Sequence, residues 1–256
     1  MINILSAALI VLLLIGAGTC GKGSYNEDYL APKQSKAVRG VAAIFILFHH
    51  LSFKICVEGS IFYNCYAYVG ILCVAVFFFY SGYGLTISLR NKKNYMQGFI
   101  RKRFLTILVP YLMIAFIYWI WSAMNGNPYS IRYMLLSYLS GYPFVENSWY
   151  VVVILFYYLV FYILVKIGGS HNHKIILGGT ILFVIIWMLF CIWRQWGSWW
   201  YVSGMALVVG ALWGMDVLKI CNYVKGHYVV TISGCTLIWG LHIFNYRGFY
   251  CSGLYL

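Results

Sequence analysis

The stretch RGVAAIFILFHH, residues 39–50, begins with an arginine, continues through uncharged residues and ends with two adjacent histidines. Its apolar middle predicts a helix in an apolar environment. A charged side chain inside a membrane helix costs roughly 2.5–3.5 kcal/mol on insertion scales, so ionisable residues there are candidates for a functional site. The rest of the chain shows whether this helix crosses a membrane and which of its ends faces the cytoplasm.

The composition of the whole chain places this helix in a lipid bilayer. Of the 256 residues, 63% are hydrophobic and 9% are charged, whereas a soluble domain has about 45–50% apolar and about 25% charged residues. No soluble fold of this length hides so much apolar side chain behind so little charge. The chain is therefore predicted to be all-α, a polytopic bundle of transmembrane helices.

A helix that crosses a bilayer needs about 17–25 apolar residues, and eight runs qualify. They cover residues 2–20, 37–53, 67–89, 104–123, 148–166, 175–193, 199–218 and 227–245. The first run has no basic residue before it and no small-residue cleavage site, so we expect an uncleaved anchor. The sequence thus divides into an anchor with its cytoplasmic linker (1–35) and a membrane domain of about seven spans (36–256). Segment 90–103, RNKKNYMQGFIRKR, is compatible with a short interfacial helix.

The basic residues predict the orientation of the spans. With the N-terminus outside, most of them fall in the inner segments: Lys22, Lys33, Lys36, Arg39, Arg90, Lys92, Lys93, Arg101, Lys102, Arg103, Lys166, Lys174, Lys219 and Lys225. Only Lys54, Arg132, Arg194 and Arg247 fall outside. Because basic residues collect on the cytoplasmic side, Arg39 is expected to start its helix there, in a multi-pass protein of the cytoplasmic membrane. Their scatter through short gaps argues against a nucleic-acid-binding face.

Helical geometry relates Arg39 to His50. At about 100° and about 1.5 Å per residue, the two side chains share one face, roughly 16.5 Å apart along the axis. His49 points about 100° away from His50. Arg39 is therefore placed to hold an anion at the cytoplasmic surface while His50 acts deeper in the membrane. The alternative is that His50 only hydrogen-bonds a neighbouring helix.

Three later stretches accompany this helix in a fixed order: FFFYSGYG (77–84), FIRKRFLTILVPYLM (99–113) and NSWYVVVILFYYLVFY (147–162). Together with the Arg-x10-His spacing of residues 39–50, they resemble the motifs of the acyltransferase-3 family, multi-spanning membrane acyltransferases that modify extracytoplasmic carbohydrates. The resemblance covers roughly residues 36–166. It implies that an acyl group, commonly acetyl, passes from cytoplasmic acyl-CoA to a sugar hydroxyl, with acyl-CoA as co-substrate and no bound cofactor.

The resemblance also implies roles for the residues of the first helix. His50 is expected to be the catalytic base, which takes a proton from the attacking hydroxyl and returns it to the thiolate leaving group. His49 is the rival for this role, but it is expected to give structural support at a position beside the substrate. Arg39 is expected to hold a phosphate of CoA, unless it is an interfacial anchor at the inner face.

The basic run of the third motif is the second candidate for the CoA phosphates. Arg101 and Arg103 offer planar, bidentate donors to phosphate, although such a cluster also serves membrane topology alone. The family often carries Arg-x-x-Arg here, whereas this chain has Thr106 in the second place. One donor contact of the family is therefore not expected in this chain.

Two more motif positions are expected to contact the substrates. Ser81 and Tyr83 are expected to line an acyl channel, with packing at a helix crossing as the alternative. Trp149 and Tyr150 are expected to stack on the acceptor sugar, with an interfacial aromatic belt as the alternative.

Other residues limit the chemistry. The only acids are Glu27, Asp28, Glu58, Glu146 and Asp216, which disfavours a carboxylate-pair glycosidase and a transporter with intramembrane acid relays. The cysteines show no metal-ligand spacing, so no metal site is expected. Cys56 and Cys65 share one outer loop, where a disulfide is chemically allowed. His242 has no assigned role.

Two other functions stay open on the sequence alone. One is a transporter or flippase for a small or glycan-linked solute, although the chain shows no inverted repeat. The other is an inactive, truncated member of the family, because the usual family domain has more spans than the seven counted here. A chain of this length is also compatible with a site completed in a homo-oligomer.

Overall fold

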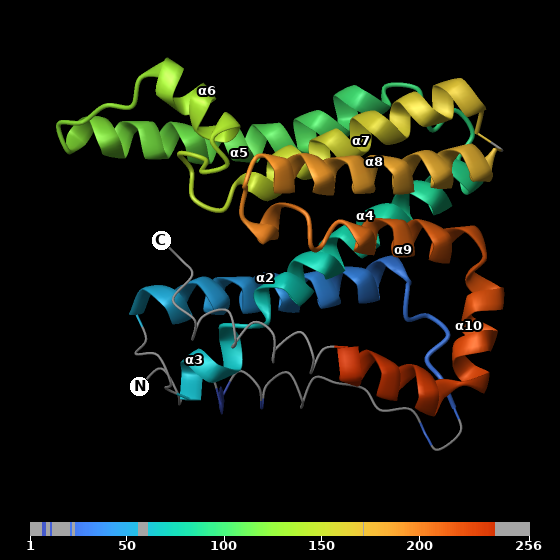
Figure 1. Cartoon of the computed structure of the whole chain (residues 1–256). Helices are drawn as coiled ribbons and strands as arrows, with labels where there is room; N and C mark the ends of the chain where they lie inside the picture. The colour runs from blue at the N-terminus through green and yellow to red at the C-terminus, as the bar shows by residue number, and fades with distance from the viewer. Residues whose placement is uncertain are drawn as a thin grey trace. The chain divides into compact units, whose positions relative to one another are not determined.

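The computed structural model describes residues 7, 8, 11, 21, 24–55, 61–170 and 172–238. Every regular element within these residues is a helix (Figure 1), so the chain is an all-α protein, as predicted. The helices are α2 (Pro32–Ile55), α3 (Ile61–Tyr66), α4 (Gly70–Asn91), α5 (Phe99–Met124), α6 (Ile131–Leu139), α7 (Trp149–Gly168), α8 (His173–Trp193), the 3-10 turn η1 (Ser198–Trp200), α9 (Met205–Met215) and α10 (Val217–Gly226). A further apolar helix covers Tyr228–Ile238.

Five of these helices, α2, α4, α5, α7 and α8, are long and apolar enough to cross a membrane. Ser198–Met215 and Val217–Gly226 pass the same test jointly and make a sixth candidate if they count as one span. The described part of the chain therefore holds five or six candidate spans, and the predicted number of eight is not confirmed. Most of the predicted span 2–20, and the end of the predicted span 227–245, lie outside the described residues.

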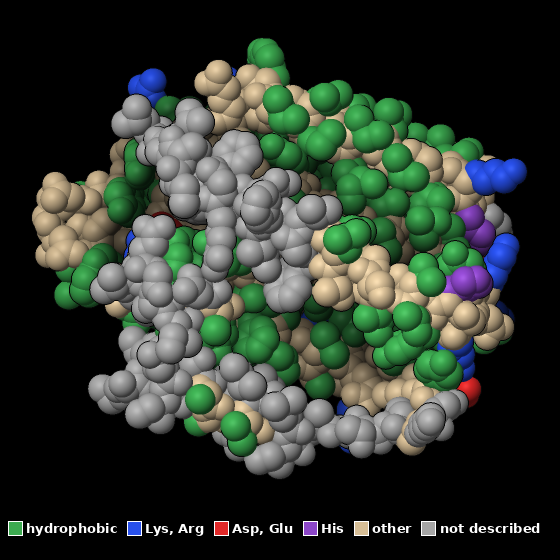
Figure 2. All heavy atoms as spheres, turned by 60° about the horizontal axis from the view of Figure 1, so that its bottom comes forward, with side chains coloured by type: hydrophobic (Ala, Val, Ile, Leu, Met, Phe, Trp, Pro, Cys, Tyr) green, Lys and Arg blue, Asp and Glu red, His purple; other side chains and the backbone are tan. Residues whose placement is uncertain are grey.

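Large apolar side chains cover the surfaces of these helices. On α5 alone, Leu112, Met113 and Trp121 are 57%, 64% and 68% exposed. Figure 2 shows hydrophobic side chains over much of the face it presents, with few charged ones among them. Apolar area on this scale marks a contact surface rather than a water-facing one. Lipid supplies that contact, and the chain is a multi-pass membrane protein.

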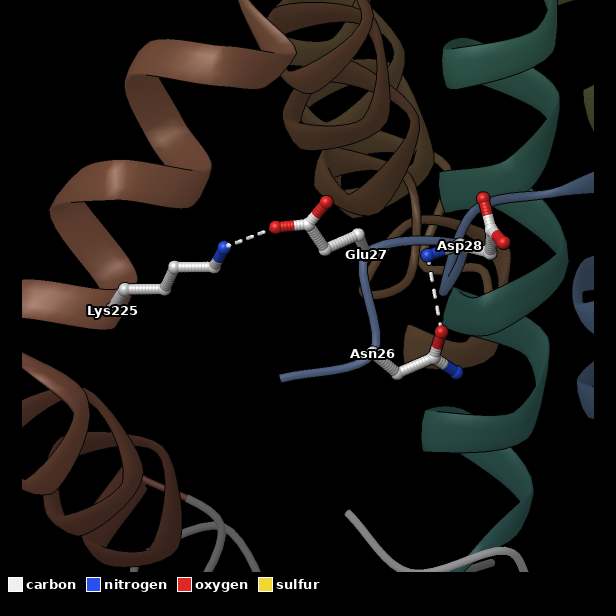
Figure 3. A network of polar contacts seen from close by, with 4 residues as sticks. All are labelled: Asn26, Glu27, Asp28 and Lys225. Carbon is white, nitrogen blue, oxygen red and sulfur yellow. Dashed lines mark hydrogen bonds and ion pairs between the residues drawn. The ribbon is translucent and has the colours of Figure 1, made fainter. Parts of the chain in front are cut away.

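The chain forms two compact units, residues 1–77 with 216–256, and residues 78–215. In the first unit α2 packs against α3. The linker before α2 contacts α10, where the Lys225 ammonium lies 3.4 Å from the Glu27 carboxylate (Figure 3). The same ammonium lies 5.4 Å from the ring centre of Tyr25. Glu27 is 84% exposed, so this ion pair contributes at most about 1 kcal/mol. The division of the chain at residue 35 stays a prediction.

In the second unit α7 lies between α5 and α8, side by side in Figure 1, and α9 packs on α8. Two helices of this unit have a polar N-cap residue. The Ser130 hydroxyl accepts from the Tyr133 amide at the start of α6, and the Asn172 side chain accepts from the Ile175 amide at the start of α8. Such caps satisfy amides that have no partner within the helix.

The segment 90–103 is not an interfacial helix, contrary to the sequence-based expectation. α4 ends at Asn91, residues 92–98 form turns, and α5 begins at Phe99. Asn94 and Gly98 adopt left-handed conformations, with φ of 56° and 69°. A left-handed residue cannot continue a right-handed helix, and two of them turn the chain directly from one span into the next.

Helices α4 and α9 cross where glycines let their backbones meet. A Cβ added to Gly82 would fall on the carbonyl oxygen of Leu207 and the amide of Ala211. One added to Gly210 would fall on the carbonyl oxygen of Phe79. Small residues are typical of helix interfaces in membranes because they allow this approach. The crossing therefore requires glycine at both positions.

Candidate functional site

The first group of predicted site residues lies on one uninterrupted helix. α2 runs from Pro32 to Ile55 without a break, so Arg39 and His50 share a helix face at a separation of about 16.5 Å. Both side chains are half-buried. Their common helix was predicted correctly, and their catalytic roles stay predictions.

Arg39 folds back toward the start of α2. Its Nε donates to the carbonyl oxygen of Ser35 at 3.1 Å, and its Nη2 donates to the Ser35 hydroxyl at 3.4 Å. These contacts hold the near side of the guanidinium against its own helix. The planar group is thereby oriented at the end of α2 that the charge distribution assigns to the cytoplasm.

His49 is built into the packing of the first unit. Its Nδ1–H donates to the carbonyl oxygen of Tyr66 at 3.1 Å, and because a carbonyl can only accept, the proton sits on Nδ1. Its ring meets that of Phe53 edge to face at 5.1 Å. A Cβ at Gly70 would fall on the imidazole. His49 thus ties α2 to α3 and to the start of α4, and its place beside the substrate stays a prediction.

The ring of His50 lies beside that of His49, with the ring centres 5.0 Å apart and the planes tilted by 59°. The turn that carries both histidines is reinforced by the Ser52 hydroxyl, which is fully buried and donates to the His49 carbonyl at 2.7 Å. This bond stabilises the turn of α2 on which His50 lies. The role of His50 as the base stays a prediction.

The second group of site residues surrounds a basic hollow of about 360 Å³ in the second unit. The basic hollow is lined by Lys92, Lys93, Asn94, Tyr95, Phe99, Lys102, Arg103 and Thr106. Four of these side chains carry a positive charge, and the described part of the hollow contains no acid. Its electrostatics suit an anion with more than one negative charge.

Arg101 and Arg103, for which the sequence predicted the same role, differ in their position relative to the hollow. Arg103 lines it, whereas Arg101 is exposed and lies outside its lining. Thr106, which replaces the second arginine of the family pattern, is also in the lining, and its hydroxyl donates to the Lys102 carbonyl at 2.6 Å. That hydroxyl proton is already used within the helix.

Lys92 and Lys93 also line the hollow. The charge pattern of the sequence predicted only that they lie on the cytoplasmic side, and it did not indicate a role in the site. They lie in the turn between α4 and α5, and the left-handed Asn94 and Gly98 fold that turn onto the first turn of α5. An Asn and a Gly within a short polar gap were the available signal, because both residue types favour left-handed backbone.

Ser81 and Tyr83 flank the glycine of the α4–α9 crossing, and both are half-buried. The packing role that the sequence allowed for this motif is observed at Gly82 itself. Whether Ser81 and Tyr83 line an acyl channel stays a prediction.

Trp149 and Tyr150 start α7 within an aromatic cluster. The ring of Trp149 lies 6.3 Å from that of Trp200, and the ring of Tyr150 lies 5.0 Å from that of Phe78. Trp200 is fully buried and its Nε1 donates to the Gly141 carbonyl at 3.0 Å. Each of the two rings, Trp149 and Tyr150, therefore packs against another aromatic ring on one side. Stacking of the acceptor sugar on the opposite face of either ring stays a prediction.

Among the residues described, no three His, Cys, Asp or Glu side chains come together as metal ligands. Cys65 is an exposed free thiol, whereas Cys56 and His242 lie outside the described residues. The disulfide that the sequence allows between Cys56 and Cys65 therefore falls outside the described residues.

Comparison with known proteins gives one match. The acyltransferase-3 model, an acyltransferase domain, matches residues 34–255. No curated protein and no solved structure matches the chain. The match includes both helix α2 with its histidine pair and the segment that forms the basic hollow.

Proposed function

Because the chain belongs to the acyltransferase-3 family of acyltransferases, we propose that it transfers an acyl group, most simply acetyl, from cytoplasmic acyl-CoA to a hydroxyl of a cell-surface or lipid-linked carbohydrate. We place it in the cytoplasmic membrane with its N-terminus outside, because that orientation keeps most Lys and Arg residues on the inner side. The acceptor would be met from the outer side.

The observation that carries this proposal is the histidine pair of α2. His49 donates to the Tyr66 carbonyl. We assign the chemistry to His50, because His50 stands at the Arg-x10-His spacing of the family motif. A ring nitrogen of His50 takes the proton of the sugar hydroxyl as its oxygen attacks the thioester carbonyl. The carbon–sulfur bond then breaks, and the imidazolium returns the proton to the departing thiolate. Histidine suits both steps because it exchanges protons near neutral pH.

We assign the phosphates of the donor to the basic hollow. CoA carries several phosphate charges, and the four cationic side chains of the hollow match that demand. Arg103 would supply the planar, bidentate contact, and the lysines would act as point charges. Arg101 on the exposed face and Arg39 on α2 are the remaining candidates for donor contacts.

The other predicted site residues complete the proposal. Ser81 and Tyr83 would contact the acyl chain. Trp149 and Tyr150 would stack on the acceptor sugar. His49 would lie beside the substrate, next to the base His50. Each of these roles follows from the family resemblance and the position of the residue in its helix.

The experiment is acyl transfer by the full chain in membrane vesicles, from radiolabelled acetyl-CoA to purified cell-surface glycan. Wild type should label the glycan, and His50→Ala should lose at least about a hundredfold in rate, the usual value of a general base. The matched control is His49→Asn, whose amide keeps a donor near the position of Nδ1. Transport of glycan or solute by vesicles that transfer no acyl group would contradict the proposal.

A further inference from the structure

Arg103 is held in a box of aromatic side chains at the wall of the basic hollow. Its guanidinium carbon lies 6.0 Å from the ring centres of Tyr95 and Phe99, and 5.5 Å from that of Tyr158. Phe99 and Tyr158 are 2% and 6% exposed, so two walls of the box are rigid core. Contacts of this kind between a cation and an aromatic face are favourable, more so when water is excluded.

Tyr95 closes the box from the turn between α4 and α5. Its hydroxyl accepts a hydrogen bond from Arg103 Nη2 at 2.6 Å. The bond crosses from the turn to the first turns of α5, because the two residues are eight apart in sequence. One edge of the guanidinium is thereby fixed on a side chain that itself lines the hollow.

Fixing the guanidinium matters because an arginine side chain is otherwise mobile. Binding a phosphate normally costs part of its rotamer entropy, and a guanidinium that is already oriented loses less of it for each hydrogen bond formed. The lysines of the hollow are not enclosed by aromatic rings in this way in the described structure, and Lys92, Lys93 and Lys102 are all exposed. Arg103 is therefore the one pre-oriented cation among the four that line the hollow.

We propose that Tyr95 is a positioning residue for phosphate recognition: it orients Arg103, so that the basic hollow binds the phosphate-bearing end of the acyl donor. This inference depends on the proposed function for the identity of the donor. Tyr95 does not touch the reacting atoms. Its loss affects donor affinity, and the acyl-transfer step itself continues.

The test compares Tyr95→Phe with wild type in the full chain in detergent. The substitution removes the Tyr95 oxygen that accepts from Arg103 and leaves the Tyr95 ring and the contact of Arg103 with Tyr158 in place. The matched control is Tyr162→Phe, because Tyr162 stacks on Phe99 at 6.1 Å without a bond to Arg103 in the described structure. Direct binding of CoA and of pantetheine, which lacks all phosphates, is measured by calorimetry, and transfer is measured with acetyl-CoA and acetyl-pantetheine.

We expect Tyr95→Phe to weaken CoA binding and raise KM for acetyl-CoA about tenfold, the typical effect of losing a hydrogen bond to a charged group. The kcat with acetyl-CoA, and kcat/KM with acetyl-pantetheine, should stay near wild type, and Tyr162→Phe should change neither. Equal losses with both donors would show a merely structural role and overturn the inference. Unchanged CoA affinity in Tyr95→Phe would also overturn it.

The binding measurement keeps this inference separate from the proposed function. A wild-type chain that binds CoA in a Tyr95-dependent way but transfers no acyl group would support the inference and contradict the proposed activity. If the wild-type chain transfers acyl groups and Tyr95→Phe leaves its CoA affinity unchanged, the proposed activity is supported and the inference is contradicted. A chain that binds no CoA would overturn both.

Discussion

His49 and Tyr66 are joined by a hydrogen bond of 3.1 Å from the imidazole Nδ1 to the main-chain carbonyl, across seventeen residues. This bond ties the first of two adjacent histidines to the packing of α2 against α3. The second, His50, lies on the same turn of α2 and is the residue to which we assign the chemistry.

Replacing His49 should affect stability more than chemistry. His49→Ala removes the bond to Tyr66 and the edge-to-face contact with Phe53, which should cost about 1 kcal/mol or slightly more in the free energy of unfolding. Thermal unfolding in detergent measures this loss, and His49→Asn should recover part of it. A His49→Ala protein of wild-type stability that has lost all acyl transfer would give His49 the catalytic role.

The two arginines of the basic run should separate in a kinetic assay. Arg103→Gln removes from the hollow the cation that Tyr95 orients. It should raise KM for acetyl-CoA by about tenfold or more, the effect of losing a charged hydrogen bond. Arg101→Gln, on the exposed side of the same helix, should raise it only slightly. Steady-state kinetics at constant salt compare the two. A larger effect for Arg101 would move the phosphate site out of the hollow.

Glycine 82 and glycine 84 should differ sharply although they belong to one motif. A Cβ at Gly82 falls on the backbone of α9, whereas one at Gly84 meets nothing within 4 Å. Gly82→Ala should therefore destabilise the protein by about 1–3 kcal/mol, the usual range for overpacking, and Gly84→Ala should not. Thermal unfolding of the two variants side by side is the measurement. Equal stability of the two would contradict the observed crossing of α4 and α9.

Two tyrosine hydroxyls of the second unit should also behave in opposite ways. Tyr157 is 2% exposed, and its hydroxyl has no hydrogen-bond partner in the described structure, so Tyr157→Phe should leave stability unchanged or raise it. The Tyr138 hydroxyl bonds to both Tyr111 and Ser148. Tyr138→Phe should cost about 1–2 kcal/mol. Loss of stability in Tyr157→Phe, measured by the same unfolding assay, would show that its hydroxyl has an acceptor after all.

Much of the fold could be read from the sequence because hydropathy alone decides which helices enter a bilayer. The predicted spans 37–53, 67–89, 148–166 and 175–193 correspond to α2, α4, α7 and α8, with ends that differ by a few residues. The break at Asp216 was missed, because an apolar run from 199 to 218 gives no sign that the Asp216 side chain caps a new helix at the Lys219 amide.

The site was less accessible to sequence reasoning because its contacts are tertiary. The spacing of Arg39 and His50 is a helical property and was predicted. The contact that holds His49 depends on the Tyr66 carbonyl, which no pattern in residues 39–50 contains. Likewise, the difference between Arg101 and Arg103 depends on how the turn at Asn94 brings Tyr95 onto α5.

The most direct test of the central claim is the O-acetyl content of surface glycan in a strain that lacks this chain and is complemented with wild type, His50→Ala or His49→Asn. Membrane levels of all three proteins are matched by immunoblot. We predict that acetyl is lost on deletion, restored by wild type and largely by His49→Asn, and absent with His50→Ala. Full restoration by His50→Ala would remove His50 from the chemistry, and a wild-type protein that reaches the membrane without restoring acetyl would contradict the proposed activity.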